Sequence, residues 1–147
     1  MSELDTLNHP ILLVEDNPMD VDLTKRAFAR RKLVNPIEVA RDGEEALDYL
    51  SRWETGEPLP VVILLDLKLP KVGGLEVLRR LKAHPRFHSV PVVVLSSSDE
   101  DHDIQTAYEL GVNSYIVKPV DFDKFVKVAK RIEVYWTVLN EPPRCAE

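Results

Sequence analysis

Asp66 follows the most apolar run in the chain, residues 61–65. A short, continuous apolar run of this kind predicts a strand that is buried on both faces of a sheet. A second run, residues 11–14, predicts another such strand and is followed by Glu15 and Asp16. Because open α/β sheets place their sites at the carboxyl ends of parallel strands, we expect these carboxylates to meet at one edge.

Three carboxylates in one crevice repel one another strongly unless a cation lies among them. Oxygen ligands of this kind suit a hard cation such as Mg²⁺. We therefore predict a magnesium site at Glu15, Asp16 and Asp66. The plainer alternatives are that Glu15 and Asp16 only favour the start of a helix, and that Asp66 only caps a loop.

A hydroxyl group and an ammonium group follow two further predicted strands. Residues 91–95 precede Ser96, and residues 114–117 precede Lys118. A phosphoryl group on Asp66 would need both, because the ammonium neutralises its oxygens and the hydroxyl donates a hydrogen bond to one of them. The alternatives are that Ser96 is a simple turn former and that Lys118 is a solvated surface residue.

In this order and at these strand ends, the residues resemble the receiver domain of two-component response regulators. The resemblance covers residues 10 to about 135 and rests on Glu15-Asp16, Asp66 with Pro70 and Gly74, Ser96, Tyr115 and Lys118-Pro119. It implies a single α/β domain with a doubly wound, five-stranded parallel sheet, the flavodoxin-like arrangement of CheY. A narrower resemblance, to the small regulators of cyanobacterial phytochromes, rests on residues 66–71, residues 91–96 and a last helix with Tyr135 and Trp136.

The resemblance implies roles for the acidic residues. Asp66 would be the phosphoacceptor, attacking a phosphohistidine of a partner histidine kinase to give an acyl phosphate. The narrower resemblance suggests a phytochrome as that kinase. Asp16 would bind Mg²⁺ directly and Glu15 through water, and the backbone carbonyl of Lys68 would supply another oxygen.

The remaining roles concern the response to phosphorylation. Ser96, where the family more often has threonine, and Lys118 would contact the phosphoryl oxygens. Movement of Ser96 toward Asp66 would let Tyr115 turn inward, which makes a two-state surface. The alternative is that Tyr115 is a fixed surface aromatic.

Strand and helix patterns alternate five times along the chain, as in a parallel sheet covered on both faces. We predict an N-terminal arm at residues 1–9, the receiver domain at residues 10–140 and a tail at residues 141–147. Asn17 is expected to cap the first helix, and Asp99 the fourth. Tyr108 of the fourth helix is expected to point inward, and the last helix to begin near Asp121.

The composition excludes several classes of function. The net charge of −6 argues against a nucleic-acid partner, which usually meets a basic surface. No apolar run approaches the roughly 20 residues needed to span a bilayer. The lack of a signal-peptide core and the single cysteine favour a cytoplasmic protein. Only a short segment follows Asn140, so we expect output through protein contacts instead of a DNA-binding domain.

Two surfaces are predicted to bind partners. Leu23 and Ala27 form a stripe offset from the buried face of the first helix, and we expect a groove there for a kinase helix. Tyr135, Trp136 and Leu139 extend past the expected end of the core. A homodimer through the fourth helix, the last strand and the last helix would cover them. The alternative is that Trp136 folds back onto its own chain.

Three classes of function fit the predicted site. A stand-alone response regulator is favoured, with no turnover beyond slow loss of its own phosphoryl group. A Mg²⁺-dependent phosphohydrolase that uses an aspartyl phosphate would need a second acid two residues after Asp66, where this chain has Lys68. A docking-only pseudo-receiver would not need the complete set of site residues.

Overall fold

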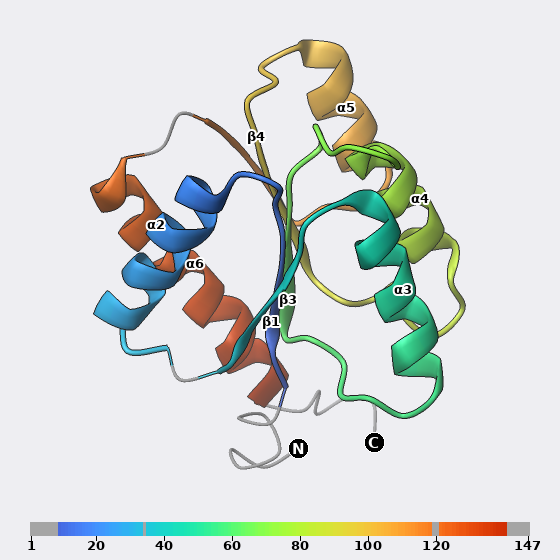
Figure 1. Cartoon of the computed structure of the whole chain (residues 1–147), viewed down its shortest axis with the longest axis horizontal. Helices are drawn as coiled ribbons and strands as arrows, with labels where there is room; N and C mark the ends of the chain where they lie inside the picture. The colour runs from blue at the N-terminus through green and yellow to red at the C-terminus, as the bar shows by residue number, and fades with distance from the viewer. Residues whose placement is uncertain (1–8, 34, 119–120, 141–147) are drawn as a thin grey trace.

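The computed structural model describes residues 9–33, 35–118 and 121–140, without the side chains of 132 and 134–140. Strands and helices alternate along the described chain (Figure 1). The strands are β1 (Ile11–Val14), β2 (Ile37–Ala40), β3 (Val62–Leu65), β4 (Val92–Ser96) and β5 (Ser114–Val117). The helices are α2 (Pro18–Arg30), α3 (Gly43–Glu54), α4 (Gly74–Ala83), α5 (Asp101–Glu109) and α6 (Phe122–Asn140).

The five strands form one parallel sheet in the order β2-β1-β3-β4-β5. Helices α2 and α6 cover one face, and α3, α4 and α5 cover the other (Figure 1). The chain order reverses direction across the sheet at β1, so the predicted doubly wound, flavodoxin-like arrangement is confirmed. The strands predicted at residues 11–14, 61–65, 91–95 and 114–117 are all present, with bounds that differ by one residue at most.

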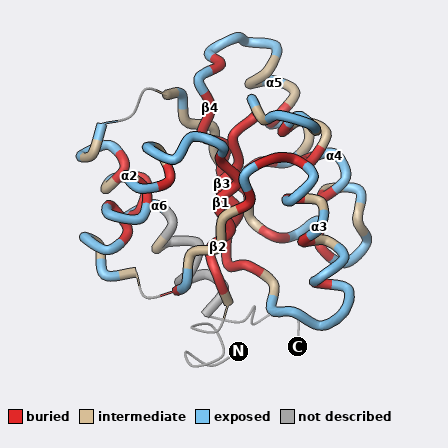
Figure 2. Tube along the Cα trace, viewed as in Figure 1, coloured by how far each residue is buried: buried red, intermediate tan, exposed pale blue. Residues whose placement is uncertain are grey.

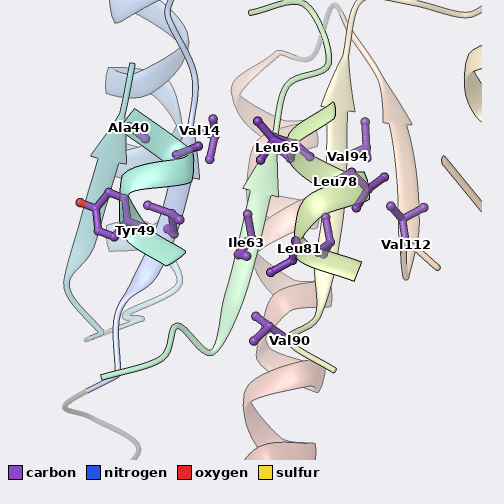
Figure 3. Packing of buried hydrophobic residues seen from close by; sticks show 14 of the residues in the cluster. Val14, Ala40, Tyr49, Ile63, Leu65, Leu78, Leu81, Val90, Val94 and Val112 are labelled. Atoms are coloured by element: carbon purple, nitrogen blue, oxygen red, sulfur yellow. The ribbon is translucent and has the colours of Figure 1, made fainter. Parts of the chain in front are cut away.

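Successive residues of the central strands point into two apolar cores on opposite faces of the sheet. In β1, Leu12 and Val14 face the core beneath α3, α4 and α5, whereas Ile11 and Leu13 face the core beneath α2 and α6. The central strands are buried along their whole length (Figure 2). Figure 3 shows the first core, in which side chains of the sheet pack against Leu78 and Leu81 of α4.

Helix α2 begins as predicted, because the Asn17 side chain accepts hydrogen bonds from the backbone N–H groups of Met19 and Asp20. The prediction that Ala27 lines a groove for a kinase helix is wrong. Helix α2 packs against α6 as well as the sheet, so Ala27 is completely buried. Leu23 is half-buried against the same core.

Two expectations for α5 are also wrong. Asp99 is not its N-cap; Glu100 holds that position without a side-chain capping bond. The Ser98 hydroxyl instead accepts a hydrogen bond from the Glu100 backbone N–H, at 3.4 Å. Tyr108, expected to point inward, is 50% exposed, and its hydroxyl accepts a hydrogen bond from the backbone N–H of Tyr115 in the edge strand β5.

Within the described residues, no helix combines the length and the apolar character that a membrane span requires.

Candidate functional site

The register of the central strands brings the predicted acids together. Val14 of β1 pairs with Leu65 of β3, so Glu15 and Asp66 leave the sheet side by side. The Asp66 backbone N–H donates to the carbonyl of Val14 at 3.0 Å, and the Glu15 N–H donates to Ala40 at 2.9 Å. These bonds fix both backbones at the carboxyl edge.

Three carboxylates meet at this edge, as predicted. One oxygen from each of Glu15, Asp16 and Asp66 lies within 4.8 Å of the others. Glu15 and Asp66 are buried, at 3% and 7% exposure, whereas Asp16 is exposed to solvent. A hard cation could therefore contact two buried carboxylates and one exposed carboxylate while it keeps several water ligands, as Mg²⁺ does in proteins.

Lys118 reaches this cluster from the end of β5. Ser96 and Val117 are paired, and the Lys118 backbone N–H donates to the Ser96 carbonyl at 2.8 Å. The Lys118 ammonium forms an ion pair with Glu15 and lies 2.9 Å from Asp20 Oδ2 and 3.3 Å from Asp66 Oδ2. Lys118 thus lies beside Asp66 with its side chain only 11% exposed, so it is not the solvated surface residue of the alternative interpretation. Its contact with a phosphoryl group stays a prediction.

Asp20 is the residue of this site that sequence reasoning missed. It lies in the first turn of α2, where an acidic side chain is usually explained by the helix dipole. The sequence did contain a signal for this placement. Pro18 marks the start of the helix, so the first helical turn, which holds Asp20, directly follows Glu15-Asp16 and must lie beside this acidic pair. The ion pair of Asp20 with Lys118 shows that it belongs to the cluster.

The charges at this edge do not balance. Among the described residues, Glu15, Asp20 and Asp66 form ion pairs with the single ammonium group of Lys118, and Asp16 lies in the same cluster as Glu15 and Asp66. Burial raises the pKa of the Glu15 carboxyl from 4.5 to about 7, although the Lys118 ammonium opposes this shift. Burial alone would lower the pKa of Lys118, but its hydrogen bonds to Glu15 and Asp20 raise it. The excess of negative charge fits a site that takes a cation.

Ser96 is completely buried at the end of β4. Its hydroxyl oxygen accepts a hydrogen bond from the Ser98 backbone N–H at 3.3 Å. Ser97, the next residue along the chain, is exposed. The tyrosine predicted to act as a switch, Tyr115, donates from its hydroxyl to the Ser98 carbonyl at 2.8 Å. Whether its ring moves on phosphorylation stays a prediction.

The loop after Asp66 is held close to the carboxylate. The Lys68 backbone N–H donates to Asp66 Oδ1 at 3.0 Å, while the Lys68 side chain is exposed. The Gly74 N–H donates to the Leu67 carbonyl at 2.9 Å, and a Cβ at Gly74 would lie 2.3 Å from the Asp66 carbonyl oxygen. Glycine at 74 therefore lets α4 start directly against the Asp66 backbone. The metal-binding role of the Lys68 carbonyl stays a prediction.

Residues 11–130 match the family model of the response regulator receiver domain. The chain belongs to this family. It is 46% identical over 134 residues to the probable methanogenesis regulatory protein FilR2 of Methanothrix harundinacea, covering 90% of this chain and 86% of FilR2. It is 38% identical over 128 residues to the response regulator Rcp1 of a Synechocystis species, covering 86% of this chain and 87% of Rcp1.

Solved structures of receiver proteins share the fold. The phosphorylated cyanobacterial phytochrome response regulator RcpA superposes with a TM-score of 0.80 at 38% identity, over 92% of this chain and 99% of RcpA. The Mn²⁺-bound form of Rcp1 superposes with a TM-score of 0.78 at 35% identity, over 92% of this chain and 99% of Rcp1. The bacteriophytochrome response regulator RtBRR superposes with a TM-score of 0.74 at 52% identity, over 92% of this chain and 84% of RtBRR. This receiver is therefore related to phytochrome response regulators and carries the acidic cluster at which receivers bind a divalent metal.

Proposed function

We propose that the protein is a stand-alone response regulator that accepts a phosphoryl group on Asp66 in a Mg²⁺-dependent reaction. The observation that carries this proposal is the set of groups around Asp66. Its carboxylate lies 3.3 Å from the Lys118 ammonium and shares an acidic cluster with Glu15 and Asp16. Ser96 ends the neighbouring strand β4.

In the proposed reaction, an Asp66 carboxylate oxygen attacks the phosphorus of a phosphohistidine on a partner kinase. The new P–O bond forms as the P–N bond breaks, and the electron pair of that bond stays on the imidazole nitrogen. Lys118 neutralises one phosphoryl oxygen, and the Ser96 hydroxyl donates a hydrogen bond to another. Asp16, Asp66 and the Lys68 carbonyl would hold Mg²⁺ directly and Glu15 through water, and the cation would supply further positive charge.

A phosphoacceptor fits the site better than a turnover enzyme does. The residue two positions after Asp66 is Lys68, and its exposed side chain is a cation instead of the general acid that a phosphohydrolase needs. Loss of the phosphoryl group would then be slow, which suits a signal. We propose the receiver domain at residues 10–140, acting in the cytoplasm without nucleic-acid or membrane partners.

We propose a histidine kinase as the partner, with a phytochrome as the candidate. RcpA, Rcp1 and RtBRR support this choice, because RcpA and RtBRR are named as phytochrome response regulators and Rcp1 resembles this chain over a similar length. FilR2, at 46% identity, is named for methanogenesis and favours a different input. Phosphotransfer to this protein from a purified phytochrome kinase and from a purified histidine kinase that is not a phytochrome, compared at equal concentration, would decide between these inputs.

A small phosphodonor and intact-mass measurement test the central proposal. Incubation with acetyl phosphate and Mg²⁺ should add the mass of one phosphoryl group. Consumption of donor without a stable adduct would indicate a phosphohydrolase. Neither adduct nor consumption would indicate a docking-only protein.

Asp66→Asn is expected to abolish this adduct while the fold is retained, because only the nucleophile and one metal ligand are lost. Apo stability should rise slightly, since one carboxylate leaves the crowded cluster. A phosphorylated Asp66→Asn protein would contradict the assignment. Circular dichroism of the variant provides the control for folding.

We also propose a homodimer through α5, β5 and α6. Exposed apolar groups on this face support it, Tyr108 at 50% and Val117 at 39%. The side chains of Tyr135, Trp136 and Leu139, which the sequence predicts at this contact, lie outside the described part of the chain. Sedimentation of the wild type and of a Trp136→Ala, Leu139→Ala variant tests the dimer. A wild type that stays monomeric at high concentration, with and without phosphorylation, would exclude it.

A further inference from the structure

Asp20 lies beside the Lys118 ammonium at the start of α2, but the proposed reaction gives it no role. Its carboxylate oxygen Oδ2 lies 2.9 Å from Lys118 Nζ, and its side chain is 27% exposed. Asp20 is not among the three carboxylates whose oxygens lie within 4.8 Å of one another, those of Glu15, Asp16 and Asp66. It therefore meets the other acids through Lys118.

The Lys118 ammonium has three N–H groups, and three carboxylates lie within hydrogen-bonding distance of it. Glu15 accepts one hydrogen bond, Asp20 accepts a second at 2.9 Å, and Asp66 accepts a third at 3.3 Å. The N–H groups diverge from one nitrogen at fixed angles, so two partners determine the direction of the third N–H. Glu15 and Asp20 together therefore direct the remaining N–H toward Asp66.

The local structure of α2 holds Asp20 in place. Asn17 Oδ1 accepts hydrogen bonds from the backbone N–H groups of Met19 and Asp20, at 2.9 and 3.4 Å. The Asp20 carbonyl accepts a hydrogen bond from the buried Thr24 hydroxyl at 2.7 Å. A lysine side chain, in contrast, is flexible and loses rotamer entropy when it is fixed. Asp20 thus offers a fixed acceptor to a mobile ammonium.

Glu15 alone would be a poor anchor for Lys118 in the proposed reaction. Glu15 lies in the acidic cluster, and a cation bound there would compete for its oxygens. Asp20 lies outside the three-carboxylate set, so its bond to Lys118 can persist when a cation binds. Positive charge beside the reacting group is most effective when it is in place before the reaction begins.

We propose that Asp20 is a positioning residue that orients the Lys118 ammonium toward Asp66 and thereby speeds transfer of a phosphoryl group to that carboxylate. This inference rests on the proposed phosphorylation of Asp66. The N–H that contacts Asp66 in the free protein is directed at the incoming phosphoryl oxygens, while Asp20 keeps its own hydrogen bond to Lys118. Asp20 touches none of the reacting atoms.

Two plainer roles for Asp20 make different predictions. An acid in the first helical turn interacts favourably with the helix dipole, and its loss would lower stability without changing the phosphorylation rate. Loss of a metal-binding acid would lower the affinity for Mg²⁺, and a higher Mg²⁺ concentration would restore the rate. The rate at saturating Mg²⁺ separates the proposal from both roles.

Intact-mass measurement over time gives the rate constant of phosphorylation by acetyl phosphate at saturating Mg²⁺. In this reaction the P–O bond to Asp66 forms as the P–O bond to acetate breaks, and acetate leaves with the electron pair. The variants are Asp20→Ala, which removes the acceptor, and Asp20→Asn, which keeps an acceptor oxygen. Asp22→Ala is the matched control, because this exposed carboxylate of the same helix pairs with Arg26. Urea denaturation over a range of Mg²⁺ concentrations checks the fold and identifies saturation.

In Asp20→Ala we expect the rate constant to fall about tenfold, the factor that one hydrogen bond to a charged group is worth. Asp22→Ala should react at the wild-type rate, and Asp20→Asn should recover most of the loss. Because the effect of Asp20 passes through Lys118, the double variant Asp20→Ala, Lys118→Met should be no slower than Lys118→Met alone. A purely structural role for Asp20 would slow both backgrounds equally.

An Asp20→Ala protein that reacts at the wild-type rate or faster at saturating Mg²⁺ would overturn the inference, while the proposed function would stand. So would a double variant about tenfold slower than Lys118→Met, or an Asp20→Asn protein as slow as Asp20→Ala. A wild type that takes no phosphoryl group would overturn both proposals. If Asp20→Ala does not fold, Asp20→Ser decides the question, because its side chain ends one bond short of the carboxylate oxygens.

Discussion

Different polar groups lie at the two ends of the central strands, the amino edge where the strands begin and the carboxyl edge where they end. At the amino edge, Pro10 and Pro91 precede β1 and β4, and their carbonyls accept hydrogen bonds from Val61 and Ile63 at 2.8 and 2.9 Å. Proline has no N–H to satisfy and a fixed φ, so backbone carbonyls, which carry no net charge, close this edge. At the carboxyl edge, Glu15 and Asp66 are buried beside each other.

This difference shows where the fold accepts a cost in stability. Neutral carbonyls at the amino edge are satisfied within the chain and require no ligand. Within the described part of the chain, the carboxylates at the opposite edge outnumber the single ammonium group that contacts them, that of Lys118. Like charges held together destabilise the folded state until a cation binds, so the carboxyl edge should respond to ligands and the amino edge should not.

The largest effect is expected from two lysines, one at each edge. Lys118→Met leaves Glu15, Asp20 and Asp66 without their ammonium partner and should cost about 3 kcal/mol in the absence of divalent cations. Lys82 at the amino edge donates to the carbonyls of His88 and Val90. Lys82→Met should therefore cost only about 1 kcal/mol.

Urea denaturation with and without Mg²⁺ measures both lysine effects. Added Mg²⁺ should recover part of the loss in Lys118→Met, because the cation supplies positive charge to the same carboxylates. It should leave the loss in Lys82→Met unchanged. Equal costs for the two variants, or equal responses to Mg²⁺, would show that the two edges do not differ in this way.

Two adjacent glycines sharpen the comparison at the carboxyl edge. A Cβ at Gly74 would lie 2.3 Å from the Asp66 carbonyl oxygen and 2.5 Å from Leu67 Cα, whereas a Cβ at Gly73 would meet nothing within 4 Å. Gly74→Ala should cost about 2 kcal/mol or more, because backbone must move to admit the methyl group. It should also slow phosphorylation, since the displaced backbone is that of Asp66.

Gly73→Ala provides the matched control for this effect. Its stability and its phosphorylation by acetyl phosphate should both stay close to those of the wild type. If Gly74→Ala were as stable and as readily phosphorylated as Gly73→Ala, close packing of α4 against the Asp66 backbone would not matter to the site.

The next effect is a dependence of stability on pH that belongs to Glu15. Burial raises the pKa of this carboxyl from 4.5 to about 7, so between these values the folded protein binds more protons than the unfolded chain. Without divalent cations, the contribution of Glu15 to stability should therefore increase as the pH falls from about 7 toward 4.5. The slope is at most about 1.4 kcal/mol per pH unit.

Glu15→Gln should remove this part of the pH dependence, because the amide does not titrate. Urea denaturation in EDTA at several pH values measures the slope for both proteins. Asp48→Asn, on the outer face of α3, is a control in which an exposed carboxylate is lost. A Glu15→Gln protein with the wild-type slope would show that the buried carboxyl does not carry the effect.

The strands and the acidic cluster could be predicted from the sequence because each depends on a local pattern. A short apolar run that ends in Asp66 or Glu15-Asp16 specifies both the buried strand and the edge where its acid emerges. The parallel arrangement then follows from the alternation of strands and helices. No long-range contact has to be known for these steps.

The wrong and missed predictions each depend on a contact with a distant helix or strand, which the sequence of a single segment cannot reveal. Ala27 lies on a flank of α2 that would be open if α6 did not cover it. Asp20 belongs to the site only because Lys118 of a distant strand reaches it. Tyr108 is half exposed, and its hydroxyl accepts a hydrogen bond from the backbone N–H of Tyr115 in the edge strand. In each case, tertiary packing decided what helical periodicity left open.

The smallest effect is expected at the amino edge itself. Pro91→Ala keeps the carbonyl that accepts from Ile63, so the hydrogen bond at this edge is retained. The cost should be below about 1 kcal/mol and should arise mainly from the greater freedom of the unfolded chain. Pro58→Ala, in an exposed loop, changes that freedom equally, and the difference between the two variants isolates the edge. Neither variant should alter phosphorylation or the stabilisation by Mg²⁺. A Pro91→Ala protein with weaker Mg²⁺ stabilisation would mean that the two edges are coupled through the sheet, because Pro91 is separated from the acidic cluster by the whole length of β4.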